Sequence, residues 1–134
     1  MAPKIERLPL RTSEDVVSVR QAARAIAVEI GLSLVDQTKT VTAASELARN
    51  TVVYGGGGWA HFEVLNRAGK KGMRVVFEDQ GPGIPDIEKA LQDGFTTGSG
   101  LGLGLGGAKR LVNEFDISST PGIGTRVTIT KWKL

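Results

Sequence analysis

Two segments in the first half of the chain carry apolar residues at helical spacing, and both are predicted to be amphipathic helices. In the first, Thr12 or Ser13 is expected as the N-cap and Gly31 as the end, and the apolar stripe is Val16, Val19, Ala23, Ile26 and Ile30. The second covers about residues 34–53, with the stripe Leu34, Val41, Ala44, Ala48 and Val52. The four glycines at 55–58 end it and are interpreted as a loose surface loop.

Alternation of apolar and polar residues predicts strands in much of the remaining chain, over residues 4–10, 59–66, 72–79, 116–120 and 124–134. The sequence "AGKKG" joins the second and third as a hairpin, and "PGIG" joins the last two. Pro9 favours an edge position for the first strand, because proline cannot donate to a neighbouring strand.

Two shorter helices are expected near residues 86–92 and over residues 107–115. Because the helices come early, in the middle and late, and the strands mostly pair antiparallel, the predicted fold class is α+β. The expected architecture is a two-layer α/β sandwich, with a mixed, mostly antiparallel sheet covered on one face by helices. The length of 134 residues fits a single domain over residues 1–134.

Composition and charge exclude several function classes. The absence of cysteine excludes disulfides and thiolate chemistry. The formal net charge is +3, but the lysines and arginines are scattered, so we expect no nucleic-acid binding. No run of about 18 apolar residues predicts a membrane span, and the N-terminus does not resemble a signal peptide. A cytoplasmic location is therefore expected.

The glycine-rich run at 96–107, "TTGSGLGLGLGG", fits none of three familiar phosphate-binding loops. A P-loop is excluded because Lys109 lies between alanine and arginine, without a following serine or threonine. A dinucleotide fingerprint needs a preceding strand, and a protein-kinase glycine loop needs further motifs downstream. The backbone N–H groups of such a run, placed before a helix, nevertheless suit phosphates.

Two polar residues of the second predicted helix are candidates for chemistry. Glu46 and Asn50 are four residues apart, so their side chains share one face. A carboxylate and an amide can serve as a general base and a magnesium ligand, since Mg²⁺ takes few protein ligands and prefers phosphates and water for the rest. An ordinary solvated pair on the helix surface is the alternative interpretation.

Asp79 ends a predicted strand and is followed by Gly81 and Gly83. A buried carboxylate there can accept a hydrogen bond from an exocyclic amine such as that of adenine, and the glycines let a flat base approach the backbone. The Thr125 hydroxyl, at the start of the last strand, is expected to brace Asp79. Aspartate before glycine and proline is also a turn signal by itself, so a plain turn remains open.

Four motifs taken together resemble the four boxes of the GHKL ATP-binding fold, and they occur in the same order and spacing. They are "ELARN", "EDQGPGIPD", "GSGLGLGL" and "GTRVTI". The whole chain resembles the small anti-sigma-type serine/threonine kinases, and among these the switch kinases of stressosomes.

The resemblance implies a role for each candidate. Glu46 is the implied catalytic base and Asn50 the implied magnesium ligand. The implied adenine site is Asp79 with Gly81, Gly83, Ile84 and Thr125. The implied lid over the phosphates consists of Gly98, Ser99, Gly100, Leu101, Gly102, Leu103 and Gly104.

The function implied by the resemblance is an ATP- and Mg²⁺-dependent protein serine/threonine kinase. Its implied substrates are STAS-domain proteins of a stressosome. Its second implied partner is an output protein, such as a PP2C-type phosphatase, reached by partner switching. Two other functions remain open: a nucleotide-binding module that captures a partner with little or no phosphoryl transfer, and a GHKL ATPase piece of a larger machine.

Overall fold

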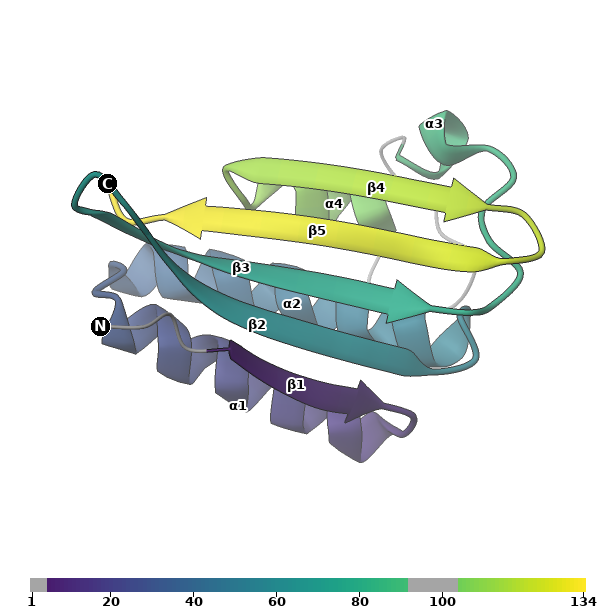
Figure 1. Ribbon diagram of the computed structural model, residues 1–134, viewed down its shortest axis with the longest axis horizontal. Helices are drawn as coiled ribbons and strands as arrows, with labels where there is room; N and C mark the ends of the chain where they lie inside the picture. The colour runs from purple at the N-terminus through teal and green to yellow at the C-terminus, as the bar shows by residue number, and fades with distance from the viewer. Residues whose placement is uncertain (1–4, 92–103) are drawn as a thin grey trace.

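In the computed structural model, a five-stranded sheet has helices packed on one face (Figure 1). The structure describes residues 5–91 and 104–134. The strand order is β1-β2-β3-β5-β4. The strands are β1 (Ile5–Leu10), β2 (Gly58–Arg67), β3 (Lys70–Asp79), β4 (Glu114–Thr120) and β5 (Gly124–Trp132). Pro9 lies in β1 at one edge of the sheet, as predicted.

All four strand pairings are antiparallel. Between β1 and β2 the chain passes through two long helices, α1 (Ser13–Glu29) and α2 (Leu34–Val53), which lie behind the sheet in Figure 1. β3 and β4 run in the same direction, but β5 lies between them, so they do not pair. The predicted two-layer sandwich is confirmed, and its sheet is more uniformly antiparallel than expected.

A capping box fixes the start of α1. The Thr12 side chain accepts a hydrogen bond from the backbone N–H of Asp15, and the Asp15 carboxylate accepts from the N–H groups of Arg11 (2.8 Å) and Thr12 (3.1 Å). These bonds, the one from Arg11 first, hold the pKa of Asp15 below its usual value. Gly31 follows the helix at φ 85°, a conformation that favours glycine.

The predicted bounds of α2 are those observed, but its predicted apolar stripe is wrong at one end. Val41, Ala44 and Ala48 are buried, whereas 72% of Leu34 is exposed. Leu34 is the first residue of the helix and takes no part in the buried core.

The β2–β3 hairpin is tighter than predicted, because its turn is only Ala68 and Gly69. Both have positive φ, 54° and 81°, which is the geometry of a type I′ turn. The two strands therefore reach Arg67 and Lys70, beyond the expected limits.

The prediction of a helix over residues 107–115 is wrong at its C-terminal end. α4 covers Gly104–Arg110, after the short α3 (Ile87–Ala90), and β4 already begins at Glu114. The N–H of Asn113 bonds to the carbonyl of Thr130, and its side chain accepts from the N–H of Trp132. Pairing with β5 therefore replaces helical bonding after Arg110. Gly104, expected in the lid, is the first residue of α4.

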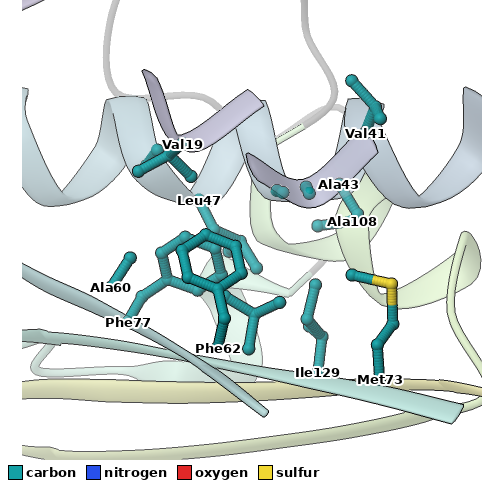
Figure 2. Close-up of a cluster of buried hydrophobic side chains, with 14 of the residues drawn as sticks. Val19, Val41, Ala43, Leu47, Ala60, Phe62, Met73, Phe77, Ala108 and Ile129 are labelled. Atoms are coloured by element: carbon teal, nitrogen blue, oxygen red, sulfur yellow. The ribbon is translucent and has the colours of Figure 1, made fainter. Parts of the chain in front are cut away.

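The core lies between the two layers (Figure 2). Phe62 and Phe77 project from the sheet and Leu47 from α2, and each is at most 2% exposed. Ala43 and Ala108 are fully buried, and such small side chains let α4 approach α2 closely. Within the part of the chain that the structure describes, no helix combines the length and apolar character needed to cross a membrane.

Candidate functional site

A cavity of about 430 Å³ lies where β3 ends and β5 begins, and α2, α3 and the start of α4 complete its walls. It brings together the predicted site residues of the described chain, except Gly81. Those that line it are Glu46, Asn50, Asp79, Gly83, Ile84, Gly104 and Thr125. The predicted lid residues Gly98, Ser99, Gly100, Leu101, Gly102 and Leu103 lie outside the described residues.

The apolar part of the cavity wall belongs to the core. Leu47 from α2, Phe77 from β3 and Val127 from β5 are buried core residues that also line the cavity. A pocket with an apolar wall and a few polar groups is typical of a site for a flat organic ligand.

Glycines surround Asp79 so closely that no side chain fits in their place. The Asp79 Oδ1 atom accepts a hydrogen bond from the N–H of Gly81 (2.9 Å). A Cβ at position 55 would lie 2.5 Å from Asp79 Oδ2, and a Cβ at position 81 would lie 2.6 Å from the carbonyl oxygen of Gly55. A Cβ on Gly124 would collide with the carbonyl oxygen of Asp79. The backbone therefore leaves the carboxylate in a tight cradle that opens to the cavity.

The sequence interpretation missed part of this cradle. Gly55 and Gly58 are not a loose loop, because each packs against the end of β3. In that quartet only Gly56 has open space where a Cβ would lie. The signal available in the sequence was the run of glycines itself, but nothing local connects position 55 with position 79.

Thr125 does not brace Asp79 through its hydroxyl, so that prediction is wrong. The two residues face each other in the β3–β5 pairing, but the Thr125 hydroxyl is hydrogen-bonded to that of Ser119 (2.9 Å). Ser119 also accepts a bond from the N–H of Ile84 (2.7 Å) and donates to the carbonyl of Gly124 (3.2 Å). Ser119, which the sequence did not reveal, therefore ties the loop after β3 to the β4–β5 hairpin.

Glu46 and Asn50 lie on one face of α2 and both line the cavity, as predicted. The Glu46 side chain is 12% exposed, and its Oε2 lies 3.9 Å from Nη1 of Arg49, which also lines the cavity. With a rise of about 1.5 Å per residue, Asn50 lies about 6 Å along the helix axis from Glu46, toward the C-terminal end of α2, which Gly55 follows. Along this wall the order is therefore Asp79 beside Gly55, then Asn50, then Glu46.

The sequence matches a family model over most of its length. A family model described as the histidine kinase-like ATPase domain matches residues 10–131. The chain belongs to this family. The predicted resemblance to the GHKL fold is thereby confirmed.

Two relatives indicate which kind of protein this chain is within the family. The chain is 49% identical over 123 residues to the serine/threonine-protein kinase RsbT of Bacillus subtilis, covering 92% of each chain. It is 30% identical over 133 residues to the anti-sigma F factor of Thermoanaerobacter sp. (strain X514), covering 92% of this chain and 89% of that one. These similarities confirm the predicted enzyme class, serine/threonine-protein kinase, and the anti-sigma type.

Solved structures support the fold. The RsbU and RsbW domains of a Mycobacterium tuberculosis protein match with a TM-score of 0.66 at 24% identity, covering 98% of this chain and 32% of that one. The mycobacterial sensor histidine kinase MprB matches with a TM-score of 0.51 at 16% identity, covering 96% of this chain and 97% of that one.

Proposed function

We propose that this chain is an ATP- and Mg²⁺-dependent protein serine/threonine kinase that phosphorylates STAS-domain proteins of a stressosome. In the same proposal it acts by partner switching on an output protein such as a PP2C-type phosphatase. The observation that carries the proposal is the cavity beside Asp79, where a cradled carboxylate, Asn50 and Glu46 follow one another along one wall.

Asp79 fits the adenine end of the nucleotide. One carboxylate oxygen accepts from Gly81, and the carboxylate retains acceptor capacity for an exocyclic amine. Gly83 has φ 79°, and a Cβ there would lie 2.6 Å from the carbonyl oxygen of Thr120, so only glycine lets this loop approach β4. Ile84, held in place by Ser119, supplies an apolar contact at the same end.

Asn50 fits the metal. Among the described residues, no three histidine, aspartate or glutamate side chains are grouped closely enough to hold a metal ion. A single amide ligand suits Mg²⁺ that arrives with a nucleotide and keeps phosphate and water oxygens as its other ligands. When bound, Mg²⁺ neutralises charge on the phosphates. The predicted lid, residues 98–104, is proposed to donate backbone N–H groups to these phosphates.

Glu46 is proposed as the general base. Its carboxylate accepts the proton of a serine or threonine hydroxyl while the hydroxyl oxygen forms a bond to the γ-phosphorus and the bond between that phosphorus and the ADP oxygen breaks. The low exposure of Glu46 limits competition from water.

The partners are proposed from similarity alone. The relatives include a serine/threonine-protein kinase and an anti-sigma factor, and the whole chain resembles the switch kinases of stressosomes. STAS-domain proteins are therefore the first substrates to test.

The test is incubation of the chain with labelled ATP, Mg²⁺ and a STAS-domain protein of a stressosome. Label transferred to serine or threonine of that protein supports the kinase. Stable co-elution with the STAS-domain protein and ATP, without transferred label, would instead support the partner-capture module.

A further inference from the structure

A second cavity of about 440 Å³ lies at the end of the molecule opposite the nucleotide cavity. The β2–β3 hairpin, the connection between α1 and α2, and the C-terminal residues meet there (Figure 1). Helix α2, with 20 residues, spans about 30 Å between the two ends. A ligand in the second cavity therefore does not reach the first.

Positive charge dominates this second cavity. Lys70, Lys71 and Lys133 line it, and Glu29 is the acidic side chain among its lining residues. Arg67 lies in the same hairpin, directly before the turn. These five side chains carry a formal excess of three positive charges, which equals the formal net charge of the whole chain. This local excess of positive charge attracts anions.

The backbone around the cavity brings Lys71 and Lys133 together. The N–H of Lys133 bonds to the carbonyl of Lys71 (2.8 Å). A Cβ on Gly31 would lie 3.1 Å from the Lys133 Nζ atom, so the glycine leaves room for the ammonium group in the cavity wall.

The Trp132 ring lies against two basic side chains of the β2–β3 hairpin. The Arg67 guanidinium lies 5.0 Å and the Lys70 ammonium 5.5 Å from the centre of its ring. The indole N–H donates to Glu114 (2.6 Å), and the side chain packs over Gly72. These contacts position the basic side chains around the cavity.

Exposed apolar side chains lie close in sequence to the α1–α2 connection that lines this cavity. Val28 precedes the α1–α2 connection and is 57% exposed, while Leu34 and Val35 follow it and are 72% and 63% exposed. The connection itself, through Ile30 and Gly31, forms one cavity wall. This end of the molecule therefore carries both basic cavity residues and exposed apolar residues.

We propose that this basic end is a docking site for an acidic segment of a partner protein, whose carboxylates enter the cavity and whose apolar side chains contact the exposed Val28, Leu34 and Val35. Nucleic acid fits less well, because Trp132 is only 6% exposed and offers no face for base stacking.

The test uses a fluorescein-labelled peptide rich in glutamate with interspersed leucines, and the same peptide with every glutamate replaced by glutamine. Fluorescence anisotropy measures binding to the full chain, to Lys71→Glu/Lys133→Glu and to the matched control Arg20→Glu/Arg24→Glu, which reverses two exposed charges on α1. We expect the glutamate peptide to bind the wild type and the control, and to bind Lys71→Glu/Lys133→Glu roughly tenfold or more weakly. Binding should weaken with added salt.

Several results would overturn the proposal. These are equal binding of the glutamine peptide, undiminished binding to the variant with reversed lysines, displacement of the peptide by inorganic phosphate at constant ionic strength, and tighter binding of an RNA oligonucleotide or of vesicles containing anionic lipid. ATP affinity is measured on the same variants. The two cavities lie at opposite ends of the molecule. If neither the wild type nor any variant binds ATP, that result counts against the kinase proposal and not against this docking site.

Discussion

Asp79 presents its carboxylate to the cavity while one of its oxygens is held by Gly81. In Asp79→Asn an amide N–H₂ can face the exocyclic amine of adenine, so donor meets donor. We expect ATP binding to weaken by roughly 1–3 kcal/mol, or about five- to 150-fold in Kd. Titration calorimetry measures this. Asp86→Asn is the control, because Asp86 also lines the cavity but its carboxylate caps α3. Equal ATP affinity in wild type and folded Asp79→Asn would remove Asp79 from the nucleotide site.

Gly55 is predicted to matter as much as the carboxylate that it faces. In Gly55→Ala the added methyl group would lie 2.5 Å from Asp79 Oδ2, so the carboxylate must move. We expect ATP affinity to fall roughly tenfold or more, since a displaced acceptor loses its hydrogen bond. Gly56→Ala is the matched control: it strains a residue with φ 73° but places its methyl group in open space. If both variants bind ATP equally well, the glycine cradle has no part in nucleotide binding.

At the scale of single residues, the sequence could predict only relations between residues that are close along the chain. Glu46 and Asn50 could be placed on one face because helical spacing fixes it over four residues. Ser119, Gly55 and Gly124 could not be placed around Asp79, since their contacts join residues that are distant along the chain. Only the register of β3 against β5 and the path of the loop after α2 bring them together.

Among the elements, the start of α1 carries a pH-dependent contribution to stability. The pKa of Asp15 is lowered in the folded protein from a usual value of 3.8. Its ionised form therefore stabilises the fold above that value, and this contribution disappears as the pH falls through the lowered pKa. We expect the difference in unfolding free energy between wild type and Asp15→Asn to be constant near neutral pH and to shrink below about pH 4.

Urea unfolding over a pH series measures this difference. Glu14→Gln is the control, because it removes a charge from the same first turn without breaking the capping box. A difference for Asp15→Asn that stays constant into the acid range would contradict the role given to its carboxylate.

Lys131, in β5, contacts both α2 and the segment that follows α4. It is only 7% exposed, and its Nζ atom donates to the carbonyl of Leu111 (3.1 Å) and lies 3.5 Å from Oδ1 of Asp36 in α2. In Lys131→Met the carbonyl loses its partner, so we expect a loss of about 1–3 kcal/mol in urea unfolding. Arg126→Met breaks an exposed ion pair with Glu78 and should change stability by less than about 1 kcal/mol. Equal losses in the two variants would show that burial of Lys131 is unimportant.

The long elements were predictable and the C-terminal helix was not. α2 has a capping serine and an apolar face over 20 residues, so its bounds follow from local signals. In residues 107–115 the apolar residues Leu111, Val112 and Phe115 fit a helical spacing equally well. Tertiary pairing decides there: Glu114 and Phe115 align with Thr130 and Ile129 of β5, a partner that no local pattern reveals.

At the scale of the whole molecule, the fold separates two cavities: the nucleotide cavity has an apolar wall, and the second is lined by lysines. The nucleotide cavity is built where β3 ends and α2 finishes, and the basic cavity lies where α2 begins. The sequence motifs indicated the first, since each contributes residues to one wall or loop around it. The second escaped notice because its lysines come from the hairpin and the C-terminus, which appear scattered along the chain.

The most direct test of the kinase account is Glu46→Gln, which separates nucleotide binding from phosphoryl transfer. Glutamine keeps the size of the side chain but does not accept the hydroxyl proton. We expect ATP affinity close to wild type, and transfer of label to the STAS-domain protein to fall by roughly 10²–10⁴-fold. Glu14→Gln, outside the cavity, should transfer at the wild-type rate. Wild-type transfer by Glu46→Gln would contradict the account, because the cavity would then lack the base that it assigns.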